Sequence, residues 1–161
     1  MRRVAFFRHG HSPNAVAAGV DSDFDRPLSE HGRQAVRDSA QKLKNCGVKF
    51  GLIIASPLVR AAQTAELLSE VMDVPSSTLQ ALDGASGPAR VWRELLPEIS
   101  VREAVLVVGH QPGMGILAGA LLRRPPFGME PADFVLLKLD KDFDPASGLP
   151  GAAELELSSC E

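Results

Sequence analysis

The chain has 161 residues, of which 45% are hydrophobic and 23% are charged, and its formal net charge is −3. This length and apolar content suit a sizeable core, and we expect a single domain over residues 1–161. The weak negative charge predicts no extended basic surface for nucleic acid or for an anionic membrane, so any anion site must be local. The only cysteines, Cys46 and Cys160, form no C-x-x-C pair, which favours a reducing compartment such as the cytoplasm. Too few apolar residues follow Met1 for a signal sequence, and no segment is apolar over the length of a membrane span.

The first apolar run, Val4 to Phe7, ends abruptly at Arg8-His9-Gly10-His11. Such a short run of strand-forming residues predicts a strand that is buried on both faces. In open α/β sheets, ligands bind at the carboxyl ends of the strands. We therefore expect this strand to deliver Arg8 and His9 into a loop at a ligand site.

The segment from Ser12 to Leu28 is rich in Gly, Asp, Asn and Pro, a composition that predicts a loop. It contains three aspartates, which we expect to face solvent: Asp21, Asp23 and Asp25.

Helical and strand patterns then alternate along the chain. Ser29 suits the N-cap of a helix that ends at Cys46-Gly47. A β-branched run at 52–55 predicts a second buried strand, and the next helix, whose first turn Pro57 suits, carries Arg60 near its start. The remaining expected elements are a short strand at 77–79, a loop at 82–88, a helix around 91–96 ending near Pro97, a central strand at 104–108, a helix opened by Pro112, and strands at 134–139 and 153–157.

This alternation is typical of right-handed parallel crossovers with helices on both faces of one sheet. We predict a three-layer α/β/α sandwich with a mostly parallel central sheet and a C-terminal antiparallel edge hairpin. Three of its strands are followed by residues that bind or attack anions: Arg8 and His9, then Arg60, then His110. Because the carboxyl ends of parallel strands share one edge, we expect these side chains to form a cradle for a dianionic phosphoryl group.

Three segments resemble the signatures of the histidine phosphatase superfamily, which includes phosphoglycerate mutases and acid phosphatases. They are Arg8-His9-Gly10, Ser56-Pro57-Leu58-Val59-Arg60-Ala61-Ala62-Gln63-Thr64-Ala65, and Val107-Val108-Gly109-His110. The short chain and the segment Arg26-Pro27-Leu28-Ser29-Glu30-His31-Gly32 are most similar to the small phosphohistidine phosphatases of the SixA type. The resemblance runs from the first strand to about Leu139.

The resemblance implies a phosphatase in which His9 is the nucleophile that accepts the phosphoryl group. Arg8, Arg60 and His110 would then hold the phosphoryl oxygens, and we expect no metal or other cofactor. A neutral imidazole provides the lone pair that His9 needs, whereas a neighbouring phosphate should favour the charged form of His110.

The general acid is less well defined by the sequence. Asp83 is a candidate, because in many relatives a carboxylate between the second and third motifs protonates the leaving oxygen. It could equally shape a turn beside Gly84. His11 is a weaker candidate, since it directly follows the first motif.

The chain leaves no room for long insertions over the site, so we expect a shallow, open pocket that suits a phosphohistidine carried on a protein. A small phosphate ester is the alternative substrate. Two other functions stay open: a metal-dependent hydrolase that uses His9 and His11 as an H-x-H pair, and a phosphate-binding module without turnover. Arg8 argues against the metal, because its charge would repel a cation.

Overall fold

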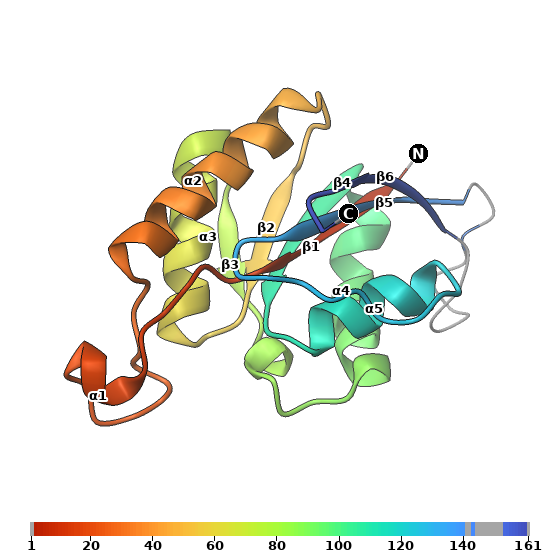
Figure 1. The fold of residues 1–161 in the computed structure, drawn as a ribbon. Helices are drawn as coiled ribbons and strands as arrows, with labels where there is room; N and C mark the ends of the chain where they lie inside the picture. The colour runs from red at the N-terminus through yellow and green to blue at the C-terminus, as the bar shows by residue number, and fades with distance from the viewer. Residues whose placement is uncertain (1, 141–142, 144–152, 161) are drawn as a thin grey trace.

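The computed structural model describes residues 2–140, 143 and 153–160. Its strands form a six-stranded sheet in the order β3-β2-β4-β1-β5-β6 (Figure 1). Neighbouring strands among β1 to β4 pair in parallel, whereas β5 is antiparallel to both β1 and β6. The prediction of a mostly parallel sheet with an antiparallel C-terminal edge is confirmed. The strands are β1 (Arg3–Arg8), β2 (Leu52–Ala55), β3 (Ser76–Thr78), β4 (Ala104–Gly109), β5 (Phe134–Leu139) and β6 (Ala153–Ser158).

Helices cover both faces of the sheet and make it the middle of three layers (Figure 1). On one face lie α2 (Glu30–Asn45) and α3 (Val59–Met72), and on the other lie α4 (Pro88–Val101) and α5 (Gly113–Leu121). Successive residues of the buried strands point to opposite faces. Phe6 therefore packs in the core beneath α4 and α5, and Phe7 packs in the core beneath α2 and α3.

The N-terminal ends of two helices follow from local chemistry. Ser29 caps α2, since its side chain accepts a hydrogen bond from the backbone of Gly32, and Glu30 places an acid in the first turn. The chain enters α3 through Leu58, whose side chain makes no capping bond. Arg60 is the second residue of α3 and is held at the edge of the sheet where β2 ends.

Several local expectations were wrong. The segment 12–28 contains a short helix, α1 (Ala15–Ala18), because the side chain of Asn14 accepts from Ala17 and caps it. A 3-10 turn, η1 (Gln80–Asp83), occupies the start of the expected loop at 82–88.

Proline positions also differ from expectation. Pro57 lies before α3 rather than in its first turn, whereas Pro88 begins α4. That helix continues past Pro97 to Val101. Proline in a helix interior removes a backbone hydrogen bond, but Ile99 beyond it is buried in the core, and this packing keeps the last turn in place.

None of the helices in the described part of the chain combines the length and the apolar character that crossing a bilayer requires.

Candidate active site

The central pair of parallel strands brings His9 beside His110. Arg8, the last residue of β1, is in register with Gly109, the last residue of β4. The backbone N–H of His9 donates to the carbonyl of Gly109 at 3.1 Å, which locks the two strand ends together. The two imidazole rings follow directly, with centroids 5.0 Å apart and planes tilted by 60°.

Arg60 reaches the same point from α3. Its Nε donates to Nε2 of His9 at 3.3 Å. Thr64, one turn further along α3, links the helix to the first motif: its hydroxyl donates to the carbonyl of Arg60 and accepts from the backbone N–H of Gly10. The start of α3 and the end of β1 are therefore joined by hydrogen bonds between residues far apart in the sequence.

The imidazole of His9 is oriented by its own backbone. Its Nδ1 lies 2.7 Å from the carbonyl oxygen of Gly10. A carbonyl only accepts hydrogen bonds, so Nδ1 carries the hydrogen and the lone pair is on Nε2, the nitrogen that faces Arg60. Burial, together with the positive charge of neighbours such as Arg60, lowers the pKa of His9 to about 3. The ring is therefore neutral at physiological pH, as expected.

His110 is held differently. Its Nε2 lies 2.8 Å from the hydroxyl of Ser56, a fully buried residue that follows β2. Burial first, and then the charge of Arg60, lowers the pKa of His110 to about 4. His110 is thus neutral in the phosphate-free protein, and the charged form expected from the sequence requires the negative charge of a bound phosphate to offset these effects.

Arg8 approaches from the third side. Its Nη1 donates to the carbonyl of Met129 at 2.7 Å, which anchors one end of the guanidinium. Its Nε is buried and has no hydrogen-bond partner within the described part of the chain. A buried donor without a partner is costly, and the same arginine lines the cavity that holds the two histidines.

Asp83 lines the same cavity as the two histidines. One carboxylate oxygen accepts from the backbone N–H of Ala85 at 2.9 Å, and the other accepts from the side chain of Gln80 at 3.3 Å. Both oxygens are therefore engaged in the turn that precedes Gly84. The negative charge of Asp83 also acts on His110, whose pKa it raises against the larger lowering effects.

Asp23 is exposed, as expected from the sequence, but it also has contacts in the site that the sequence did not predict. Its carboxylate forms ion pairs with Arg60 at 3.2 Å and with Arg26 at 2.8 Å, although 65% of its side chain is exposed. These two guanidiniums, that of Arg26 first, lower the pKa of Asp23, which is therefore an ionised carboxylate at the rim of the site. The one feature of the sequence that could have indicated this role is that Asp23 lies three residues before the SixA-like segment that begins at Arg26.

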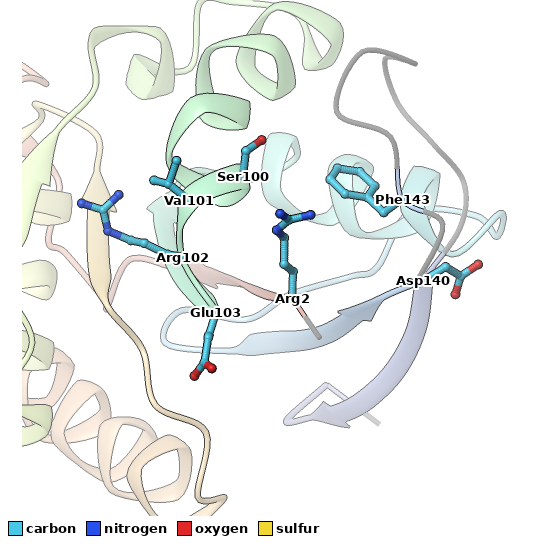
Figure 2. Close-up of a pocket in the computed structure, with 7 residues that line it drawn as sticks. All are labelled: Arg2, Ser100, Val101, Arg102, Glu103, Asp140 and Phe143. Carbon is cyan, nitrogen blue, oxygen red and sulfur yellow. The ribbon is translucent and has the colours of Figure 1, made fainter.

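All five residues singled out from the sequence, Arg8, His9, Arg60, Asp83 and His110, line a single cavity of about 480 Å³. The structure adds Asp23, Arg26 and Gln111 to its wall. A larger cavity of about 560 Å³ lies at the opposite edge of the sheet, before β1 and β4 begin. Figure 2 shows that it is lined by residues such as Arg2, Arg102 and Asp140, without any histidine.

The H-x-H pair does not converge on one point. His11 does not line the cavity: its Nδ1 pairs with the hydroxyl of Ser29 at 2.8 Å, and its ring lies against that of His31, with centroids 4.2 Å apart and planes tilted by 32°. Within the described residues, no three side chains of His, Cys, Asp or Glu are grouped to hold a metal ion. The donor positions therefore do not support a metal-dependent hydrolase built on His9 and His11.

The cavity thus combines a buried neutral imidazole with two guanidiniums and a second imidazole, which are groups whose chemistry suits a phosphoryl group. The chain belongs to the histidine phosphatase superfamily (branch 1), whose family model matches residues 4–87. That match includes four of the five cavity residues named from the sequence, and His110 lies beyond it.

Among proteins similar to this chain is the phosphohistidine phosphatase SixA of Escherichia coli, which is 32% identical over 123 residues, or 74% of this chain and 73% of that protein. An uncharacterized protein of Picosynechococcus is 38% identical over 119 residues, or 72% of this chain and 70% of that protein. The solved structure of the protein histidine phosphatase SixA complexed with tungstate has a TM-score of 0.81 at 25% identity and covers 97% of this chain and 95% of that one. A mycobacterial glucosyl-3-phosphoglycerate phosphatase shares the fold, with a TM-score of 0.67 at 23% identity over 98% of both chains. These relationships support phosphatase activity for this protein.

Proposed function

We propose that this protein is a phosphohistidine phosphatase that acts through a covalent phosphoryl group on His9. The observation that carries the proposal is the orientation of this imidazole: the carbonyl of Gly10 holds Nδ1, and the lone pair of Nε2 faces Arg60 inside the cavity. A neutral histidine with one nitrogen fixed is prepared for nucleophilic attack by the other.

In the proposed reaction, Nε2 of His9 attacks phosphorus in line with the leaving nitrogen of the substrate. An N–P bond forms to His9, the P–N bond of the substrate breaks, and the leaving imidazole keeps the electron pair and takes a proton from solvent. Arg8 and Arg60 neutralise the charge on the phosphoryl oxygens, which is the main contribution that a protein makes to such a transfer.

Water completes the proposed cycle by attacking the phosphoenzyme. An O–P bond forms from water as the N–P bond breaks, the electron pair of the N–P bond returns to Nε2 of His9, and inorganic phosphate leaves with the protons of the water or passes them to solvent. His110, neutral in the free site, takes up a proton as the dianion binds and donates to a phosphoryl oxygen.

The hydrogen bonds of Asp83 favour a phosphohistidine over an alkyl ester as the substrate. Both oxygens of Asp83 are already hydrogen-bonded in the turn, so this carboxylate is poorly placed to donate a proton to an alkoxide. Imidazole is a better leaving group than an alkoxide and depends less on such an acid. The name of the Escherichia coli relative is consistent with the same choice.

We further propose that residues 1–161 act as one domain in the cytoplasm, since few thiols suit a reducing compartment.

The test uses a peptide that carries phosphohistidine, incubated with the protein in the presence and in the absence of a chelator. We expect turnover to resist the chelator, and radiolabelled phosphoryl groups to be trapped on the protein as an acid-labile adduct. His9→Ala should abolish the adduct and the turnover, whereas His31→Ala, a substitution of an exposed histidine outside the cavity, should preserve both. Activity that requires metal and survives Arg60→Ala would overturn the proposal.

An aryl phosphate and an alkyl phosphate tested beside the peptide would decide the substrate class. Turnover of the peptide well above that of both esters is the expected result. Comparable turnover of all three would instead indicate a broad phosphomonoesterase.

A further inference from the structure

The segment that carries Asp23 is fixed in place against the start of α3. The backbone N–H of Val59 donates to the carbonyl of Phe24 at 3.0 Å, so the segment covers the first turn of the helix. Arg26 secures it from the other side by donating to the carbonyl oxygens of Pro13 and Ser12. In Figure 1 this segment follows α1 at the edge of the molecule where the parallel strands end.

Arg26 also orients Asp23 itself. Its Nη1 donates to one carboxylate oxygen of Asp23 at 2.8 Å, which leaves the other oxygen turned toward Arg60. The carboxylate is thus held between two guanidiniums that both line the cavity, and of these two Arg60 is the one bonded to His9.

Arg60 uses two different parts of its guanidinium. At the distal end, Nη1 donates to the backbone carbonyl of Asp23 at 2.8 Å and Nη2 donates to the carboxylate of Asp23 at 3.2 Å. At the near side, Nε donates to Nε2 of His9 at 3.3 Å. A guanidinium is planar and its five N–H bonds have fixed directions, so a residue that grips the distal end also sets the direction of Nε.

We propose that Asp23 is a positioning residue for phosphoryl transfer. By binding the distal end of Arg60, Asp23 keeps the Nε–H of that guanidinium directed at Nε2 of His9, where the phosphoryl group binds. The proposal rests on the proposed function of His9 and Arg60. Asp23 itself touches neither the nucleophile nor the phosphoryl group.

The physical need for such a residue comes from the arginine side chain. Arginine has many rotamers, and an unrestrained guanidinium spends much of its time out of the geometry that transfer requires. The side chain of Arg60 is only 10% exposed, and within the described part of the chain Asp23 alone contacts its distal end. Removal of the carboxylate eliminates the hydrogen bond from Nη2 and leaves the one from Nη1 to the backbone carbonyl of Asp23.

The carboxylate of Asp23 also carries a charge that opposes a phosphate dianion. Because 65% of this side chain is exposed, solvent and salt screen its repulsion of a phosphate more than they weaken its direct contact with Arg60 at 3.2 Å, whose side chain is only 10% exposed. We therefore expect the orientation of Arg60 by Asp23 to matter more than the repulsion of phosphate by Asp23. Loss of the first effect lowers turnover, whereas loss of the second raises it.

The first experiment compares Asp23→Ala and Asp23→Asn with Asp21→Ala, a control that removes an exposed carboxylate of the same segment with no described contact to Arg60. We expect Asp23→Ala to lower kcat on the phosphohistidine peptide roughly tenfold with little change in KM. Asp23→Asn should recover part of the loss, because an amide oxygen can still accept from Nη2. Asp21→Ala should match the wild type.

The second experiment asks whether Asp23 acts through Arg60. In an Arg60→Ala background, Asp23→Ala should cause no further loss, because the group that it positions is absent. Independent losses in the double variant, or a gain in phosphate affinity and turnover from Asp23→Ala alone, would overturn the proposal.

A spectroscopic measurement separates this inference from the proposed function. The Nε–H resonance of Arg60 should be resolved and slow to exchange with solvent in the wild type and in Asp21→Ala, and should broaden in Asp23→Ala and recover in Asp23→Asn. If the wild type lacks phosphatase activity, the proposed function fails while this resonance still reports on Asp23. An unchanged resonance in Asp23→Ala would reject the positioning role.

Discussion

The hydroxyl of Ser56 lies 2.8 Å from Nε2 of His110 and joins the end of β2 to the residue that follows β4. The same oxygen accepts from the backbone N–H of Leu58 at 3.2 Å, in the turn that leads into α3. One buried hydroxyl therefore couples the orientation of an imidazole in the cavity to the turn that places Arg60.

Substitution of this serine should affect activity more than stability. Ser56→Ala removes one buried hydrogen bond to a side chain and one to the backbone, and we expect a loss of about 1 to 2 kcal/mol in the free energy of unfolding. We expect kcat to fall several-fold, because His110 loses the partner that fixes its ring. Denaturant unfolding and steady-state kinetics measure the two effects. Ser100→Ala, which removes a hydroxyl that donates to the carbonyl of Leu96 within α4, is the control and should leave kcat unchanged.

Phosphate binding should be linked to protonation of His110. The pKa of this imidazole is about 4 in the free protein, mainly through burial and then through the charge of Arg60. A bound dianion stabilises the charged form, so saturating inorganic phosphate should raise the pKa of His110. Titration of the ring resonances with and without phosphate gives both values. An identical titration under both conditions would place the anion away from His110.

The stability of the free protein should decline as the pH falls below about 6.5. His9 has a pKa of about 3 in the folded protein, against an ordinary value of 6.5. Between these values the unfolded chain binds a proton that the folded state does not, so stability rises with pH through this window and is lost as the pH falls. At pH 5 the cost from His9 alone is about 2 kcal/mol.

Denaturant unfolding at pH 7 and pH 5 measures this effect. His9→Asn should be less sensitive to the change of pH than the wild type. His31→Asn replaces an exposed histidine and should keep the wild-type dependence. A wild-type free energy of unfolding that is equal at the two pH values would show that His9 is readily protonated in the fold.

Gly10 has a steric role directly after the proposed nucleophile. A Cβ atom at this position would lie 2.7 Å from a methyl group of Val36 and 3.0 Å from the carbonyl oxygen of Gly32. Gly10→Ala should therefore cost about 1 to 3 kcal/mol in the free energy of unfolding and lower kcat, because a shift of Gly10 away from α2 also displaces the neighbouring His9. Gly113→Ala is the matched control, since a Cβ there meets no atom within 4 Å. Equal stability of the two variants would show that α2 moves away from the added methyl group at no cost in stability.

Asp83 can be tested through the leaving group. If it donates a proton, Asp83→Asn lowers the turnover of an alkyl phosphate far more than that of an aryl phosphate or of phosphohistidine. Because both of its oxygens are hydrogen-bonded in the turn, we expect the three substrates to be affected about equally and by less than tenfold. A selective loss on the alkyl phosphate would restore Asp83 as the general acid.

The order of strands and helices was predictable because each buried strand is a short, uninterrupted apolar run, and each main helix carries an apolar stripe at helical spacing. The convergence of Arg8, His9, Arg60 and His110 followed from one rule of parallel sheets, namely that the carboxyl ends of the strands share an edge. Neither inference needed the details of packing.

The short helix α1 and the C-terminal end of α4 were harder to predict from the sequence. The helix α1 depends on one capping bond from Asn14, and α4 continues past Pro97 because Ile99 is buried. In both cases a contact elsewhere in the fold, or a single side-chain bond, outweighs the local preference that a sequence pattern expresses.

The sequence by itself determined which residues meet, since strand order and motif position depend on local apolar patterns. Only the tertiary structure decided how they are held: the hydrogen on Nδ1 of His9, the serine behind His110, and the grip of Asp23 on Arg60. These contacts join residues from different loops and helices. Their geometry depends on the packing of the whole fold around the edge of the sheet, which no local pattern encodes.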